Sequence, residues 1–313
     1  MGLWNKYAWM AYLAVFLGVC GHASSEFVSV LCSVKGPELS VWRFLLGGIG
    51  LVVLALIFPT SRNLLEPFYD YGLRMIWLAL MGVSLGYLLF HWSLDFASIP
   101  QVATMVTTVP IFVGLVNLWI NHQPFSGAKI ISGISAMFGV ALLITDGYLA
   151  KLAGASGNLI GVLMAMGCAA VVAAYTVMVR PIIGKYGALR ITAITMFLGA
   201  IGLWVVVGLF WRLWVNPLTL FNRAPEQTAA LLTLALWNTT VTQFLWIGGL
   251  AAVPDITRGS YLFFLKPVIA ACLAIVFLNQ SLTTWQTLAI FVICTSVAVE
   301  ASWARLHQPR TVS

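Results

Sequence analysis

Residues 256–280 read ITRGSYLFFLKPVIAACLAIVFLNQ, and this stretch decides what kind of fold the chain can adopt. From Gly259 to Leu278 it is long and apolar enough to cross a bilayer, which takes about 20 residues. Lys266 lies near its middle and Pro267 follows directly. A cation at this depth costs roughly 2.5–3.5 kcal/mol and normally faces a cavity or a partner, while proline removes a helix donor. Together they predict a transporter's substrate site; the alternative is a Lys neutralised by a buried carboxylate.

The composition of the whole chain extends this interpretation. Hydrophobic residues make up 61% of the 313 residues and charged residues only 8%, whereas soluble proteins average about 25% charged residues. We therefore expect an all-α polytopic membrane protein surrounded by a lipid bilayer. The net charge of +7 is spread along the loops, so no nucleic-acid partner is expected. The five cysteines lack metal-ligand spacing, which predicts free thiols and no metal or cofactor.

Length and polar breaks predict ten transmembrane helices. Their expected boundaries are 7–31, 39–58, 75–96, 99–120, 127–146, 158–179, 191–211, 229–251, 257–278 and 285–304. With the N-terminus inside, ten Lys and Arg residues fall on inner segments and four on outer loops. This bias predicts a multi-pass protein of the cell (inner) membrane, with both termini cytoplasmic and the 152–157 loop outside.

The two halves of the chain repeat each other. Pro110 and Gln123 recur as Pro267 and Gln280, both 157 positions later and within matching hydropathy. Each half would hold five helices, an odd number, so the second half must cross the membrane upside down. The expected architecture is a 5+5 inverted repeat with one unit at 7–146 and the other at 158–304. In such repeats the binding site lies between the halves near the midplane.

Several short motifs mark these two units. They are Trp42-Arg43-Phe44 opening the second helix, Gly86-Tyr87 in the third, Ala97-Ser98 before the fourth, and the centres Pro110 and Pro267. With these motifs, the ten spans resemble the EamA-type branch of the drug/metabolite transporter superfamily over about residues 7–304. The resemblance implies export or exchange of small metabolites, amino acids among them, through a central cavity open to one side at a time. The chain departs from such units at Gln123 and Gln280, where Glu is common.

Polar residues inside the expected spans define the candidate substrate site. Glu26 is the only acidic residue well inside a span, and His22 lies four positions earlier on the same helix face. Lys266 is expected to bind a carboxylate of the substrate, which favours amino acids over sugars. The alternative is an ion pair of Glu26 with Lys266 or with Arg43. The further candidates for lining the cavity are His91, Tyr87, Trp92, Thr104, Tyr175, Asn238, Gln243 and Tyr261.

These observations favour a secondary transporter, an exporter or exchanger of small-molecule substrates such as amino acids or related carboxylated compounds, and not an enzyme. Proton coupling through His22 and Glu26 is a hypothesis, because histidine titrates near neutrality. A facilitative, channel-like permease for other solutes is the alternative, although a channel should show rings of like residues. A membrane-embedded lipid enzyme is disfavoured because no Ser-His-Asp order or phosphate loop occurs at a useful spacing. The sequence selects no oligomeric state and is compatible with a monomer.

Overall fold

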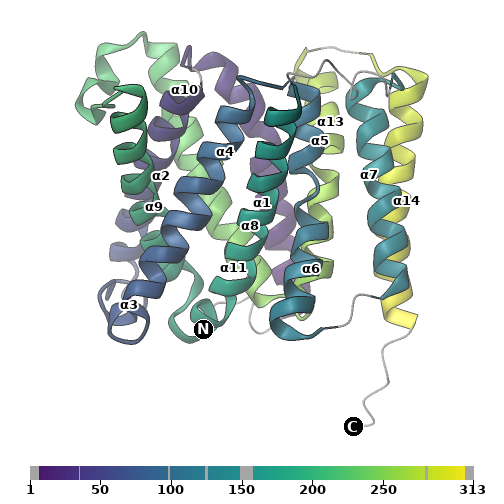
Figure 1. The fold of residues 1–313 in the computed structure, drawn as a ribbon, viewed down its shortest axis with the longest axis horizontal. Helices are drawn as coiled ribbons and strands as arrows, with labels where there is room; N and C mark the ends of the chain where they lie inside the picture. Colours follow the sequence, from purple (N-terminus) through teal and green to yellow (C-terminus); the bar gives the residue numbers. More distant parts are fainter. Residues whose placement is uncertain are drawn as a thin grey trace.

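A computed structural model describes residues 7–34, 36–97, 99–123, 126–148, 158–278 and 281–306. All regular structure within these residues is helical, and the long helices stand side by side in one bundle (Figure 1). Helix α1 begins and α14 ends at one face of this bundle, which we call the termini face; the opposite face is the far face. Ser98, Gln280 and the predicted outer loop 152–157 lie outside the described residues.

The helices of the first half precede those of the second half along the chain. The first half holds α1 (Ala8–Leu31), α2 (Gly36–Ile57), α3 (Glu66–Ala79), η2 (Leu80–Leu85), α4 (Gly86–Ser93), α5 (Ile99–Val106), α6 (Val109–Asn121) and α7 (Gly127–Thr145). The second half holds α8 (Asn158–Tyr186), α9 (Ala188–Trp211), η4 (Pro217–Asn222), α10 (Pro225–Ala235), η5 (Leu236–Val241), α11 (Thr242–Ala252), α12 (Ile256–Tyr261), η6 (Leu262–Leu265), α13 (Lys266–Leu278) and α14 (Thr284–Leu306).

These helices form the predicted membrane spans. Among the described residues, nine helical segments are long and apolar enough to cross a bilayer, and α14 contributes a shorter apolar helix, Thr284–Glu300. The all-α polytopic fold is thereby confirmed. Two boundaries were wrong by several residues, since the third span begins at Glu66 and not at 75, and the sixth ends at Tyr186 and not at 179. The reason is that backbone hydrogen bonding continues past the apolar stretch that hydropathy detects.

Pro110 and Pro267 each begin the second piece of a broken helix, as the sequence predicted. The fourth span is interrupted between α5 and α6, and the ninth passes through the 3-10 segment η6 before α13. Each proline is the second residue of the helix that follows. Its missing N–H causes no loss there, because the first turn of a helix has unpaired donors in any case.

The repeat extends to single hydrogen bonds between spans. The third and eighth spans each contain a six-residue π-helical segment, η2 and η5, 156 positions apart. The Ser84 hydroxyl of η2 donates to the carbonyl of Gly199 at 2.6 Å, and the Thr240 hydroxyl of η5 donates to that of Gly47 at 2.9 Å. A Cβ on either glycine would lie within 2.5 Å of a facing side chain. Both halves therefore bring these helices together by the same contact.

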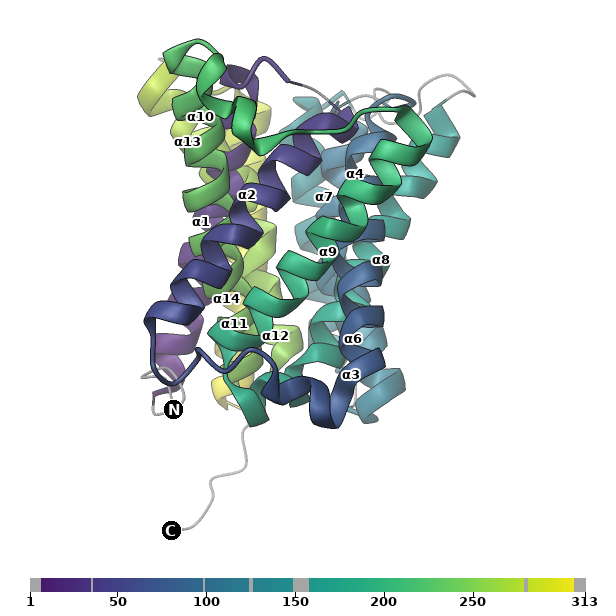
Figure 2. The same ribbon diagram turned by 90° about the vertical axis from the view of Figure 1, so that its left-hand side faces the viewer.

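The second half runs through the bundle in the opposite direction to the first. Helix α1 begins at the termini face and runs to the far face, whereas α8, the first helix of the second half, begins at the far face (Figure 1). Helices α2 and α9 pack against each other where the halves meet, and Figure 2 shows them crossing the front of the bundle. Helices α7 and α14 pair at one edge. The architecture is a 5+5 inverted repeat.

Candidate functional site

A cavity lies between the two halves of the bundle. Its volume is about 100 Å³, which is room for several water molecules. Residues of α1, α2, α4, α8, α11, η6 and α13 line it, so both halves contribute. Ser29 and His91, which both line it, lie two residues before the far-face ends of α1 and α4. The cavity thus extends from the middle of the bundle toward the far face.

Two cations give this cavity a positive character. Arg43 of α2 is only 5% exposed; its Nε donates to Thr239 Oγ1 at 3.1 Å and its Nη2 to the carbonyl of Asn238 at 3.0 Å. Lys266 of α13 places Nζ 5.9 Å from the ring centroid of Phe263. None of the lining residues that the structure describes is acidic. Two basic side chains, one from each half, therefore share this cavity.

Aromatic rings form one wall beside Lys266. The rings of Trp246 and Phe263 lie 5.0 Å apart, and His22 meets them edge-on at 5.8 and 5.7 Å. The Nε2 atom of His22 is buried and has no hydrogen-bond partner among the residues that the structure describes. Because buried polar atoms are normally hydrogen-bonded, a solute bound in this cavity is a natural partner for Nε2.

A hydrogen bond crosses the cavity on the symmetry axis of the repeat. The side-chain amide of Gln243 donates to the hydroxyl of Tyr87 at 2.5 Å. The two residues are 156 positions apart, the same offset as between η2 and η5, so they occupy equivalent places in the two halves. The contact therefore joins the halves at the point where their equivalent helices face each other.

Two polar side chains of the cavity, Lys266 and His91, do not in contrast follow the repeat. Lys266 corresponds to Val109, 157 positions earlier, and His91 corresponds to Ile247, 156 positions later. All four line the cavity. Each half thus supplies polar chemistry at a position where the other half is aliphatic. The polar lining of the cavity is therefore asymmetric between the halves.

The structure brings together six of the eleven predicted site residues. The cavity is lined by Lys266, His22, His91, Tyr87, Tyr175 and Gln243. The backbone of Glu26 lies in α1, but its side chain lies outside the described residues. The proposed ion pairs of Glu26 therefore remain predictions.

The other four predicted residues lie elsewhere in the described structure. Trp92 packs edge-on against Trp211 at 5.1 Å. Thr104 is buried in α5. Asn238 donates to the carbonyl of Gly21 at 2.7 Å and joins η5 to α1. Tyr261 donates to a backbone carbonyl of α7 near the termini face.

Sequence reasoning also missed several lining residues. Ser25 and Ser29 line the cavity from α1, and they follow His22 at three and seven positions. Phe263 precedes Lys266 by three positions. Residues three, four or seven apart share a helix face, so this spacing was the available signal.

Comparisons with known proteins agree with this arrangement. Residues 5–145 and 159–300 each match the model of the EamA-like transporter family. An uncharacterised transporter of Clostridium kluyveri is 24% identical over 294 residues, which cover 91% of each chain. An uncharacterised transporter of Archaeoglobus fulgidus is 27% identical over 289 residues, covering 91% of this chain and 94% of its own. A chain of known crystal structure matches with a TM-score of 0.80 at 15% identity, covering 96% of this chain and 99% of that one.

Proposed function

The chain belongs to the EamA-like transporter family, and from this premise we propose that it carries small carboxylated solutes, amino acids foremost, through the central cavity by alternating access. The observation that carries the proposal is that two basic side chains from different halves, Arg43 and Lys266, line the same cavity. A substrate carboxylate there would form charge-assisted hydrogen bonds, which are about twice as strong as neutral ones.

The geometry around Lys266 favours a carboxylate over a phosphate ester. Phosphate is usually bound by the two-pronged fork of an arginine. The Nε and Nη2 atoms of Arg43 already donate to Thr239 and Asn238, whereas the ammonium group of Lys266 is a compact point charge that suits a single carboxylate. An amino acid also suits the remaining groups, because the Tyr87 hydroxyl and the Gln243 amide oxygen are able to accept hydrogen bonds from an ammonium group. The rings of Trp246 and Phe263 suit its apolar side chain.

The inverted repeat supports alternating access. Two halves of similar fold and opposite orientation are able to exchange conformations, which opens the site to one face and then to the other. The excess of Lys and Arg on the inner segments supports a cell (inner) membrane protein whose termini face is cytoplasmic. His22 and Glu26, on one face of α1, are the groups we propose for coupling to protons.

Counterflow in liposomes tests the proposal. We expect purified protein to exchange labelled for unlabelled amino acids, and we expect Lys266→Met and Lys266→Arg to abolish binding of carboxylated substrates. Melting temperature and expression should stay at the parent values, because the change is confined to the cavity. Lys185→Met, on an exposed helix end, is the matched control. Normal transport by Lys266→Met would refute the site, and flux without counterflow would identify a channel-like permease.

A further inference from the structure

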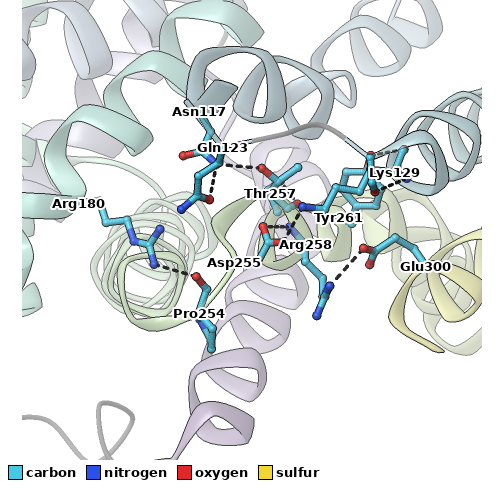
Figure 3. Close-up of polar contacts among 12 residues, drawn as sticks. Asn117, Gln123, Lys129, Arg180, Pro254, Asp255, Thr257, Arg258, Tyr261 and Glu300 are labelled. Carbon is cyan, nitrogen blue, oxygen red and sulfur yellow. Dashed lines mark hydrogen bonds and ion pairs between the residues drawn. The ribbon is translucent and has the colours of Figure 1, made fainter. Parts of the chain in front are cut away.

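The termini face carries two neighbouring ion pairs, of which one joins the two halves and the other lies within the second half (Figure 3). Lys129 of α7 places Nζ 2.6 Å from Asp255 Oδ2, and Arg258 of α12 places Nε 3.3 Å from Glu300 Oε1 of α14. Asp255 Oδ1 also accepts from the backbone N–H of Arg258 at 3.1 Å and caps α12. The Tyr261 hydroxyl donates to the carbonyl of Lys129. We call Lys129, Asp255, Arg258 and Glu300 the termini-face network.

The network is shielded from solvent and directly connected to the cavity. The side chains of Lys129 and Asp255 are 13% and 23% exposed, and that of Glu300 is 4% exposed. Removing one partner of a shielded pair leaves the other charge uncompensated, so such contacts matter more than exposed ones. Asp255 caps α12, which continues through η6 into α13, the helix that begins at Lys266. A displacement of α12 would therefore move the cation of the cavity.

Further contacts hold the turn that carries Asp255. Arg180 of α8 donates from Nη2 to the carbonyl of Val253 at 2.6 Å and from Nε to that of Ala251 at 3.2 Å. Asn117 of α6 donates to Thr257 Oγ1 at 3.5 Å. Figure 3 shows these groups converging on the start of α12 from several helices. Elements of both halves thus meet at this one point of the termini face.

The residues that the structure describes include no equivalent of this network on the far face. The repeat offset of 157 assigns to its four members the counterparts Gln286, Ser98, Gln101 and Leu143. None of these four side chains carries a charge. An arrangement that closes the termini face through ion pairs therefore cannot be reproduced by the same positions on the far face.

Two further ion pairs, unlike the termini-face network, occur on both faces of the bundle. Glu38 pairs with Arg223 at 3.4 Å on the far face, and Glu66 pairs with Arg190 on the termini face. Glu38 and Arg190 are 152 positions apart, and Glu66 and Arg223 are 157 positions apart. The two pairs thus occupy equivalent places with their charges exchanged. Since both exist at once on opposite faces, they do not distinguish one face from the other.

We propose that the termini-face network is the ionic gate that closes the cavity toward the termini face, and that its pairs separate when the substrate passes. The inference rests on the transport function proposed above. Alternating access requires contacts that are made in one state and broken in the other. The network suits this role for three reasons. Its Lys129–Asp255 pair joins the halves and its Arg258–Glu300 pair ties α12 to α14; α12 continues into the helix that carries Lys266; and the positions that the repeat assigns to the far face carry uncharged residues.

Thiol labelling of a cavity residue tests the gate. Thr176 lines the cavity and is buried, so Thr176→Cys, with the five native cysteines replaced, reports access to the cavity. An impermeant thiol reagent is applied to oriented vesicles from each face, without substrate. The parent should react faster from the far face. Glu300→Gln should raise the rate from the termini face roughly three- to tenfold, as expected for loss of a partly buried pair, and lower the rate from the far face.

The controls separate gating from general loosening. Arg258→Glu combined with Glu300→Arg restores a pair and should return both rates toward the parent. Glu66→Gln makes the same charge change on the same face outside the network and should leave both rates unchanged. The gate is refuted if Glu300→Gln and Lys129→Gln both behave like Glu66→Gln, or if the charge exchange fails to restore the rates. Because no substrate is added, the result does not depend on whether Lys266 binds carboxylates.

Discussion

Two regions of the molecule differ in how closely they follow the internal repeat. One region is the set of helices packed around α2 and α9, and the other is the cavity beside them. In the packed region, Ser84 binds Gly199 just as Thr240 binds Gly47, so the halves agree in individual hydrogen bonds. In the cavity, Lys266 stands where the other half has Val109. Close helix packing is satisfied by the same small residues in both halves, whereas binding one substrate needs one set of charges. The repeat therefore supports the fold, and departures from it support the proposed function.

The largest effect is expected from breaking the symmetric packing. A Cβ on Gly199 would lie 2.4 Å from Val83 and 2.7 Å from the carbonyl of Ala79, and a backbone atom cannot move aside as a side chain can. Gly199→Ala should therefore destabilise the protein by about 1–3 kcal/mol or more, measured as a lower melting temperature in detergent. Gly184→Ala, with no atom within 4 Å, is the control and should be neutral or slightly stabilising. Equal melting temperatures for both would contradict the close packing.

The asymmetry of the cavity can be tested by moving its cation. Lys266→Val combined with Val109→Lys keeps the charge but places it in the other half, away from the Trp246 and Phe263 wall. We expect counterflow to fall by roughly ten- to hundredfold, as for loss of a hydrogen bond to a charged group. Val109→Met, which adds bulk but no charge, should retain most activity. Full activity of the exchanged variant would show that the position of the charge is unimportant.

A smaller effect is expected at the symmetry axis. Tyr87→Phe removes the hydroxyl that accepts from Gln243 and leaves a buried amide donor without that partner. The melting temperature should fall by the equivalent of roughly 1 kcal/mol, and counterflow should fall with it, because the bond crosses the cavity. Tyr175→Phe, which loses a bond to Thr195 within the second half, should lower stability with a smaller effect on counterflow. The opposite ranking of the two variants would argue against a role for the axial bond.

The smallest effect concerns the pH dependence of the termini-face network. Burial raises the pKa of Asp255, but the hydrogen bonds and charges of Lys129 and Arg258 together lower it more, so the net shift of this pKa is downward. A lowered pKa means that the pair contributes fully above the ordinary value of about 4 and is lost as pH falls below it. The difference in melting temperature between the parent and Asp255→Asn should be constant from about pH 5 to 8 and shrink below about pH 4. A difference that grows on acidification would contradict the pairing. Asparagine retains the helix cap, which isolates the effect of the charge.

Much of the fold could be predicted, because the features that indicate a span or a helix break lie within one short segment of the sequence. The spans and the breaks at Pro110 and Pro267 follow from apolar length and from a missing backbone donor. Among the described residues the structure contains nine long spans, a shorter tenth apolar helix and both breaks. Six cavity residues could likewise be found as polar or aromatic groups within spans. The π-helical segments η2 and η5 had no such signal. Arg43 binds η5 from a position 195 residues away in the chain, and a pattern within one helix does not record a contact of that kind.

In the candidate site, patterns within one helix could not predict which residues contact each other. Trp92 and Phe263 are both aromatic residues inside predicted spans, but Trp92 packs against Trp211 while Phe263 lines the cavity. Lys129 and Asp255 could each be assigned to an inner segment, yet their pairing across 126 positions was not foreseeable. In each case the contact depends on how two helices pack against each other, and neither helix's own sequence records that packing.

By itself, then, the sequence determined the number of spans, the inverted repeat and the presence of charge at mid-membrane. These follow locally, because each span must satisfy its own backbone hydrogen bonds in lipid and must be apolar over a set length. Only the tertiary structure decided that Lys266 shares a cavity with Arg43, and that Glu300 closes on Arg258. Both are contacts between different helices, and the separation of two helices is not recorded in the sequence of either one. Gly47 and Gly199 illustrate this, because each lets its helix approach a neighbour that is far away in the chain.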